Sequence, residues 1–362
     1  MAEIMTVTGP IAPQELGFTS MHEHVLVHGR IFRERYEAFI PEDAPVRPDE
    51  PISLENLGYL KHAFILSWNT ILNTDVDLLS SELSAFKAEG GSAVVDMSVP
   101  GIRFDPMKTR EVSEKSGVHI IASTGLYAAD SWPEKYLTMT IEEMEEYMSR
   151  EVEGGIEGTP VKPGHVKVAV DVIDSDLEVK ALRAGARVIK RYGLPMCVHQ
   201  GMELGPEACD RIMMILEEEQ VDPSRVVIAH NDKLFVETNL QTLVTRPDEW
   251  TLRLEVARAL MKKGYNISID CFGQNWDAET LGILHVHDWQ RIAGLYALIN
   301  EGFSNQIVLG TDTFVKLTYR KFGGEGYCRL TSYVVPTLMS VGVKAETIKQ
   351  LTVDNPTRIL SV

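Results

Sequence analysis

The chain has 362 residues, of which 44% are hydrophobic and 24% are charged, a composition typical of a globular protein with a sizeable core. Its formal net charge of −17 argues against nucleic-acid partners, because a protein that binds a polyanion needs a basic surface. The four cysteines show no paired spacing and no apolar stretch approaches the length of a membrane span, so we expect a cytoplasmic protein without a disulfide scaffold or a membrane partner.

Short runs rich in β-branched residues recur along the chain and alternate with segments of helical periodicity. In chain order the runs are 19–27, 92–99, 118–123, 165–170, 196–200, 226–230, 267–271 and 307–310. Residues 75–89 and 177–192 are two of the helical segments, and Gly90 and Gly91 end the first of them. Strand and helix alternating eight times predict an α/β fold of the (β/α)8 TIM barrel type, whose active site lies at the C-terminal ends of the strands.

Residues 30–90 make an unusually long connection between the first and second predicted strands. This stretch opens with Pro41, Pro45, Pro48 and Pro51, and residues 54–74 then carry Leu, Ile, Phe and Trp at roughly helical spacing. A linker would be more polar. We therefore expect one domain over 1–362, with the 30–90 insertion capping or flanking the barrel.

Metal-binding residue types stand at the C-terminal ends of several predicted strands. His22 and His24 end the first strand on the same face, because side chains alternate along a strand. Other strands end in or contain Lys167, His199, His230 and Asp312. A barrel directs all these positions toward a common mouth, so the pattern predicts a metal site more strongly than any single motif does.

Lys167 lies within an apolar run, 165–170, that should be a central strand. Burial disfavours an ammonium ion, and a neutral amine can add carbon dioxide to become a carbamate. The two oxygens of a carbamate could hold two divalent cations about 3.5–4 Å apart, with a shared hydroxide as nucleophile. The alternative is a lysine that reaches solvent from a strand edge.

Asp312 follows the last predicted strand and has two possible roles. It could cap the next helix. Beside four histidines it is better placed to bind a metal, to orient the hydroxide and to carry the proton to the leaving group.

These segments resemble the phosphotriesterase family of the amidohydrolase superfamily. The residues that carry the resemblance are Met21-His22-Glu23-His24, His165-Val166-Lys167-Val168-Ala169, Val198-His199, Ile228-Ala229-His230 and Gly310-Thr311-Asp312. The match spans nearly the whole chain, and the insertion, together with residues 323–327 and 334–336, is most similar to the phosphotriesterase-related proteins and phosphosugar lactonases of that family.

The resemblance implies a binuclear centre and a homodimer. By analogy His22, His24 and Asp312 hold the more buried ion, and His199 and His230 the more exposed one. Carboxylated Lys167 would bridge the two ions. Tyr127 would lean over the metals toward the substrate carbonyl, although a loop tyrosine is as often half-buried packing.

Two departures limit what the family implies about the substrate. Acyl-homoserine lactonases of this family place an arginine after the seventh strand, where this chain reads Ile269-Asp270-Cys271-Phe272-Gly273. Mammalian phosphotriesterase-related proteins lack the bridging lysine that Lys167 supplies here. Neither group's substrates therefore transfer directly.

The loop after the eighth strand contains Arg320, Lys321 and several glycines, in a place where barrels often bind anions. We hypothesise that Arg320 and Lys321, together with Lys233 after the sixth strand, bind an anionic group of the substrate. An ordinary solvated turn is the alternative.

The sequence favours a metal-dependent hydrolase whose small-molecule substrate is a lactone or another carboxylic ester, for example a phosphorylated sugar lactone. An amidase acting on N-acyl amino acids or N-acyl sulfonates is the alternative, and promiscuous phosphotriester hydrolysis is a weaker one. A non-catalytic metal binder is a third class. Zinc is the predicted metal, although manganese, cobalt and iron suit the same ligands.

Overall fold

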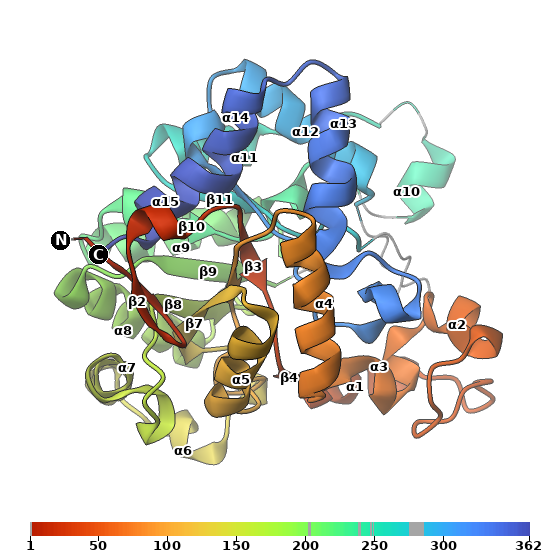
Figure 1. Cartoon of the computed structure of the whole chain (residues 1–362), viewed down its shortest axis with the longest axis horizontal. Coiled ribbons are helices and arrows are strands. Elements are labelled where there is room, and N and C mark those ends of the chain that lie inside the picture. The colour runs from red at the N-terminus through yellow and green to blue at the C-terminus, as the bar shows by residue number, and fades with distance from the viewer. Residues whose placement is uncertain (1, 202–203, 238–239, 247, 249, 275–285) are drawn as a thin grey trace.

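The computed structural model describes residues 2–201, 204–237, 240–246, 248, 250–274 and 286–362. Its main sheet has eight parallel strands in the order β12-β11-β10-β9-β8-β7-β6-β3 (Figure 1). The strands are β3 (Thr19–Glu23), β6 (Ala93–Asp96), β7 (His119–Leu126), β8 (His165–Val170), β9 (Met196–Gln200), β10 (Val226–Ile228), β11 (Asn266–Ile269) and β12 (Ile307–Leu309). The amide of Asp312, beyond β12, donates to the carbonyl of His22 in β3 at 2.9 Å, so the barrel is nearly closed. The predicted (β/α)8 barrel is confirmed.

The predicted strands agree with the observed ones at their starts and differ mainly at their C-terminal ends. The first was expected to reach residue 27, but β3 ends at Glu23, where the pairing with β6 shifts register. The sixth was expected to reach His230, but β10 ends at Ile228. His230 has φ 54°, a left-handed conformation that cannot continue a strand.

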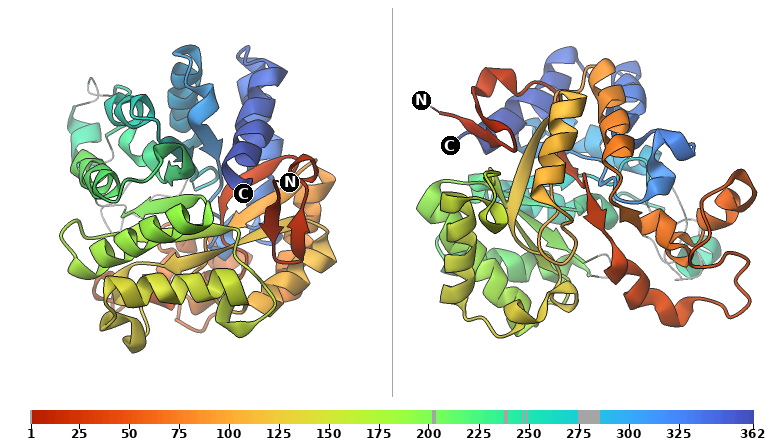
Figure 2. Two further views of the ribbon diagram at one scale, coloured as in Figure 1. Left: turned by 90° about the vertical axis from the view of Figure 1, so that its left-hand side faces the viewer. Right: turned by 60° about the horizontal axis from the view of Figure 1, so that its bottom comes forward.

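Helices cover the outside of the barrel (Figure 2). The longer ones are α4 (Val76–Ala88), α5 (Pro106–Ser116), α7 (Ile141–Gly154), α8 (Asp176–Tyr192), α9 (Pro206–Glu218), α11 (Glu255–Lys262) and α12 (Asp288–Asn300). The shorter ones outside the insertion are α6 (Glu134–Leu137), α10 (Leu240–Thr245), α13 (Val335–Ser340), α14 (Ala345–Lys349) and α15 (Asn355–Leu360). The helices predicted at 75–89 and 177–192 correspond to α4 and α8. Within the described part of the chain, none of the helices has both the length and the apolar character needed to cross a bilayer.

An N-terminal hairpin closes the end of the barrel at which the strands begin. It consists of β1 (Ile4–Thr6) and β2 (Gly9–Ile11), and the backbone of Glu3 pairs with that of Val362, so the termini lie side by side (Figure 1). Ile4 packs with Leu360 against the barrel interior. The opposite end, where the strands finish, is left for the functional site.

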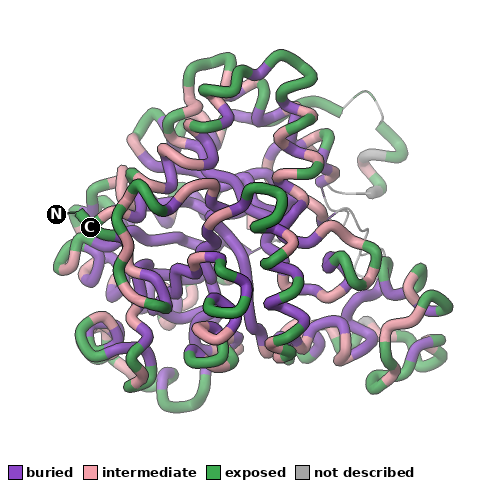
Figure 3. Tube along the Cα trace, in the orientation of Figure 1, coloured by how far each residue is buried: buried purple, intermediate pink, exposed green. Residues whose placement is uncertain are grey.

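The insertion folds into short helices held by a two-stranded ribbon. Helices α1 (Arg30–Tyr36), α2 (Leu54–Leu60) and α3 (Trp68–Ile71) lie between β4 (Val27–His28) and β5 (Leu72–Asn73), which pair antiparallel. Its small core includes Leu60, Phe64 and Ile71, and it shares Val315 and Leu317 with the loop after β12. In Figure 3 this region is exposed along its outer edge and buried where it meets the barrel. The insertion is therefore packed against the residues that follow Asp312.

Candidate metal centre

The side chains predicted as metal ligands meet at the C-terminal ends of the barrel strands. They are His22, His24, Lys167, His199, His230 and Asp312, and none is more than 9% exposed. Nε2 of His24 lies 3.2 Å from Oδ1 of Asp312, and Nδ1 of His199 lies 2.8 Å from Nε2 of His230. Nitrogen and oxygen donors this close together can share an ion whose bonds are about 2.0–2.2 Å long.

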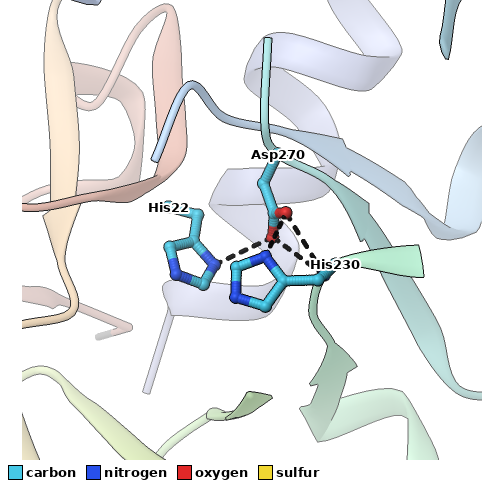
Figure 4. A group of neighbouring side chains, drawn as sticks. All are labelled: His22, His230 and Asp270. Atoms are coloured by element: carbon cyan, nitrogen blue, oxygen red, sulfur yellow. Dashed lines mark hydrogen bonds and ion pairs between the residues drawn. The ribbon is translucent and has the colours of Figure 1, made fainter. Parts of the chain in front are cut away.

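Asp270 contacts two of the histidines. Its carboxylate lies 2.8 Å from Nδ1 of His22 and 2.8 Å from Nδ1 of His230, and it sits between the two rings in Figure 4. A carboxylate accepts a hydrogen bond from an N–H group, so Nδ1 of each ring carries the proton. The lone pair of each ring is then on Nε2, which faces the other candidate ligands. Asp270 is fully buried and orients both rings at once.

The other two histidines are held in the same manner. Nδ1 of His24 lies 3.0 Å from the hydroxyl of Ser98, and Nε2 of His199 lies 2.9 Å from Oδ1 of Asp171. All four imidazoles therefore use one nitrogen for an oxygen partner and present the other to the centre. This is the usual arrangement around metal-bound histidines.

Our sequence reading did not assign roles to Asp171 and Asp270. Each directly follows the last residue of its strand, after Val170 of β8 and Ile269 of β11. That position was the available signal, since every carboxylate at a strand end faces the same mouth.

The charge states of the buried groups suit metal binding. Burial lowers the pKa of His22 to about 4 and that of His199 to about 3, so both rings are neutral near pH 7. Burial also acts on His230, but the Asp270 carboxylate outweighs it and raises the pKa of this ring. Although burial opposes ionisation, His24 and the neighbouring imidazoles hold the pKa of Asp312 below its usual range.

Lys167 is completely buried, and its Nζ lies 3.1 Å from Nε2 of His22. Among the described residues no carboxylate forms an ion pair with it. A buried ammonium without a counter-ion is strongly disfavoured. Lys167 is therefore the candidate for carboxylation, which would give a two-metal centre its bridging ligand.

Two of the ligands have left-handed backbones, with φ 54° at His230 and 46° at Asp312. Such strain persists only where the surroundings hold it. The amide of His230 donates to the Asp270 carboxylate at 3.2 and 3.3 Å, and the amide of Asp312 is bound by the carbonyl of His22. The sites of strain and of chemistry therefore coincide.

Glu23, between the two histidines of β3, holds the loop that carries Asp312. Its buried carboxylate accepts the amide of Thr311 at 2.8 Å, the amide of Thr313 at 3.0 Å and the hydroxyl of Thr311. These bonds fix the backbone on both sides of Asp312.

Aromatic side chains form a wall beside the centre. The ring of Tyr127 lies 5.2 Å from that of His199, and burial raises the pKa of its phenol well above the usual value, so it stays a proton donor. Phe314 lies 6.1 Å from His24 and 4.8 Å from Phe32 of the insertion. We call Phe32, Phe314 and Tyr127 the aromatic wall.

The structure does not bring Arg320 and Lys321 to the ligands. Their amides donate to the Glu82 carboxylate of α4, and the Arg320 guanidinium contacts Glu89 at 3.3 Å, so the chain turns against the outside of the barrel. The contact of these two side chains with a substrate anion stays a prediction that the observed hydrogen bonds do not support.

The glycines of the same loop do line a cavity of about 320 Å³. Basic residues of the insertion and of the segment after β12 border it, namely Lys61, His62 and Arg329. Thr313, the neighbour of Asp312, forms another part of its wall. Glu325 also lines the cavity, and Arg329 is paired with Glu325 and Asp288. The cavity, of mixed charge, thus lies beside the loop that carries Asp312.

Lys233 is buried near the end of β9, where its ammonium donates to the carbonyls of Gly201 and Gln200. Burial lowers its pKa to about 8. Its role in binding substrate stays a prediction.

Comparison with known proteins agrees with the fold. A model of the phosphotriesterase family matches residues 2–360. An N-acetyltaurine hydrolase from Salmo salar is 30% identical over 364 residues, covering 99% of this chain and 98% of the relative. The crystal structure of a resiniferatoxin-binding protein from Rhodobacter sphaeroides is 28% identical, with a TM-score of 0.84 over 99% of this chain and 94% of that one.

The crystal structure of a lactonase from Listeria monocytogenes has a TM-score of 0.76 over 99% of this chain and 98% of that one. Its sequence identity is 23%, so it supports the fold alone. The family match covers nearly the whole chain and includes every strand end described above. The chain therefore belongs to the phosphotriesterase family of hydrolases.

Proposed function

We propose that this protein is a metal-dependent amidase that cleaves N-acyl sulfonates or N-acyl amino acids. The observation that carries the proposal is the convergence of buried imidazoles, one carboxylate and the buried Lys167 at the barrel mouth. The donors fit two divalent cations, with His22, His24 and Asp312 on one side, His199 and His230 on the other, and carboxylated Lys167 between them. Zinc is our first choice for both positions.

Bound cations would polarise the scissile carbonyl and ease deprotonation of a water molecule. The remaining work falls to the chain. Asp312, with its low pKa, accepts the proton of the attacking water and returns it to the leaving nitrogen. The phenol of Tyr127 can donate to the carbonyl oxygen, and the aromatic wall excludes water from one side of the substrate.

The relatives change the order of the candidate substrates. The motifs alone favoured a lactone over an amide. The Salmo salar relative, which matches almost end to end at 30% identity, is named for an amide of a sulfonate. Lys61 at the border of the nearby cavity is the candidate partner for an anionic group of the substrate, because Arg329 there already pairs with Asp288 and Glu325. We therefore rank the amide first. From the family resemblance we also predict a homodimer in solution.

A small anionic lactone or another carboxylic ester is the second candidate. The aromatic wall and Tyr127 serve any acyl carbonyl, and an alcohol leaves more readily than an amine, so the same site suffices. Phosphotriester hydrolysis would at most be a side activity.

The test is turnover by zinc- or manganese-loaded protein on N-acyl taurines, N-acyl amino acids, sugar lactones with and without phosphate, and a phosphotriester. Release of free amine measures amide cleavage, and proton release measures lactone opening. Cleavage of the N-acyl compounds supports the proposal. Turnover of lactones alone would establish the second candidate, and full metal loading without any turnover would favour a non-catalytic binder.

A further inference from the structure

Arg35 of α1 ties the insertion to the barrel. Its Nε and Nη2 donate to the Asp130 carboxylate at 2.6 and 2.5 Å, and its Nη1 lies 2.7 Å from Oδ2 of Asp171. The planar guanidinium thus binds one carboxylate with two parallel hydrogen bonds and a second carboxylate with its remaining edge.

Asp171 is also the partner of a predicted metal ligand. Its Oδ1 lies 2.9 Å from Nε2 of His199, whose Nδ1 faces Nε2 of His230 at 2.8 Å. The carboxylate therefore joins the insertion on one oxygen to the candidate metal centre on the other. The side chains of Arg35 and Asp171 are 21% and 13% exposed, so the pair is better shielded than an ordinary surface ion pair.

We propose that Arg35 is a positioning residue for the metal centre and acts through Asp171 on His199. Docking of the insertion and binding of the ion held by His199 and His230 are then coupled. Partners of metal-bound histidines set ring orientation and basicity. Arg35 fixes that partner from an element outside the barrel strands.

Neighbouring residues allow this role to be separated from a merely structural one. Asp130 contacts the other edge of the guanidinium and is 51% exposed, so it supports Arg35 without touching His199. Arg30 lies on the same helix and is 60% exposed, and its contacts within the described residues are Glu34 at 3.9 Å and the face of Trp68. Arg30→Gln is therefore a matched control.

The experiment measures the affinity of both zinc ions by competition with a chelator in wild type, Arg35→Gln, Arg35→Lys, Asp130→Asn and Arg30→Gln. We expect Arg35→Gln to weaken one of the two ions by about tenfold, the lower end of the effect of losing a partner group, and to leave the other unchanged. Arg35→Lys should recover only part of the lost affinity. Its ammonium ion keeps the positive charge but cannot span both carboxylates. Asp130→Asn should lie between wild type and Arg35→Gln, and Arg30→Gln should match wild type.

Thermal melting of the same proteins reports whether the insertion and barrel remain folded. A lower melting temperature in Arg35→Gln with both zinc affinities unchanged would overturn the inference and leave Arg35 a purely structural clamp. The inference rests on the proposed metal centre, so wild type is measured first. A wild type that binds no zinc would remove the proposed function itself, whereas two ions bound equally well by wild type and Arg35→Gln would remove only the role of Arg35.

Discussion

Lys167 and His22 face each other in the barrel mouth, with Nζ 3.1 Å from Nε2 and both side chains shut off from solvent. In the described part of the chain the lysine has no carboxylate partner, although it lies among groups that normally bind cations. Carboxylation would turn this unpaired amine into an anionic ligand. The arrangement thus explains why a lysine stands in the middle of an apolar strand.

Carboxylation of Lys167 predicts that recovery of the metal-free protein depends on carbon dioxide. Metal-stripped wild type should regain activity faster and more fully when zinc is added with bicarbonate than in a buffer depleted of carbon dioxide. The measurement is activity against time after zinc addition. Lys190→Ala, an exposed lysine change, should behave as wild type. Equal recovery in both buffers would count against the carbamate.

Asp270→Asn should weaken zinc binding by about ten- to a hundredfold, because one carboxylate orients both His22 and His230. Chelator competition measures the effect. Cys271→Ser is the control, since its thiol lies 3.6 Å from His230 and burial raises its pKa well above the usual value, so it stays uncharged. If both variants bound zinc as wild type does, Asp270 would have no orienting role.

Phe314→Ala should remove one ring of the aromatic wall and open space next to His24. We expect KM for a short N-acyl substrate to rise by about fivefold, which corresponds to about 1 kcal/mol of lost apolar contact, while kcat changes less. Longer acyl chains should be accepted better than by wild type. Steady-state kinetics over a series of chain lengths tests this, with the exposed Tyr296→Ala as control. An unchanged chain-length preference would remove Phe314 from the substrate site.

Glu23→Gln should destabilise the fold, because an amide cannot accept all the hydrogen bonds that Thr311 and Thr313 donate to the carboxylate. We expect a loss of about 2 kcal/mol in the free energy of unfolding, the size of effect typical of leaving a buried donor without its acceptor. Chemical denaturation measures it, and the exposed Glu34→Gln is the comparison. Equal stability of the two variants would contradict the role assigned to Glu23.

The sequence predicted the barrel and the ligand set because strand periodicity fixes where each strand ends, and strand ends share one face. Asp171 and Asp270 obey the same rule but carry no motif of their own. Arg35 could not be predicted, since its contact with Asp171 depends on how the insertion folds back over the barrel. The position of Arg320 could not be predicted either, because composition does not determine the path of a loop, and here Glu82 accepts a hydrogen bond from its backbone amide.

The most direct test of the central claim is elemental analysis of metal bound per chain in zinc-reconstituted wild type and Lys167→Ala. The account predicts two ions per chain in wild type and fewer than two in Lys167→Ala, which would still be folded by circular dichroism. Wild type without bound metal, or two ions held equally by both proteins, would contradict a binuclear centre bridged by Lys167.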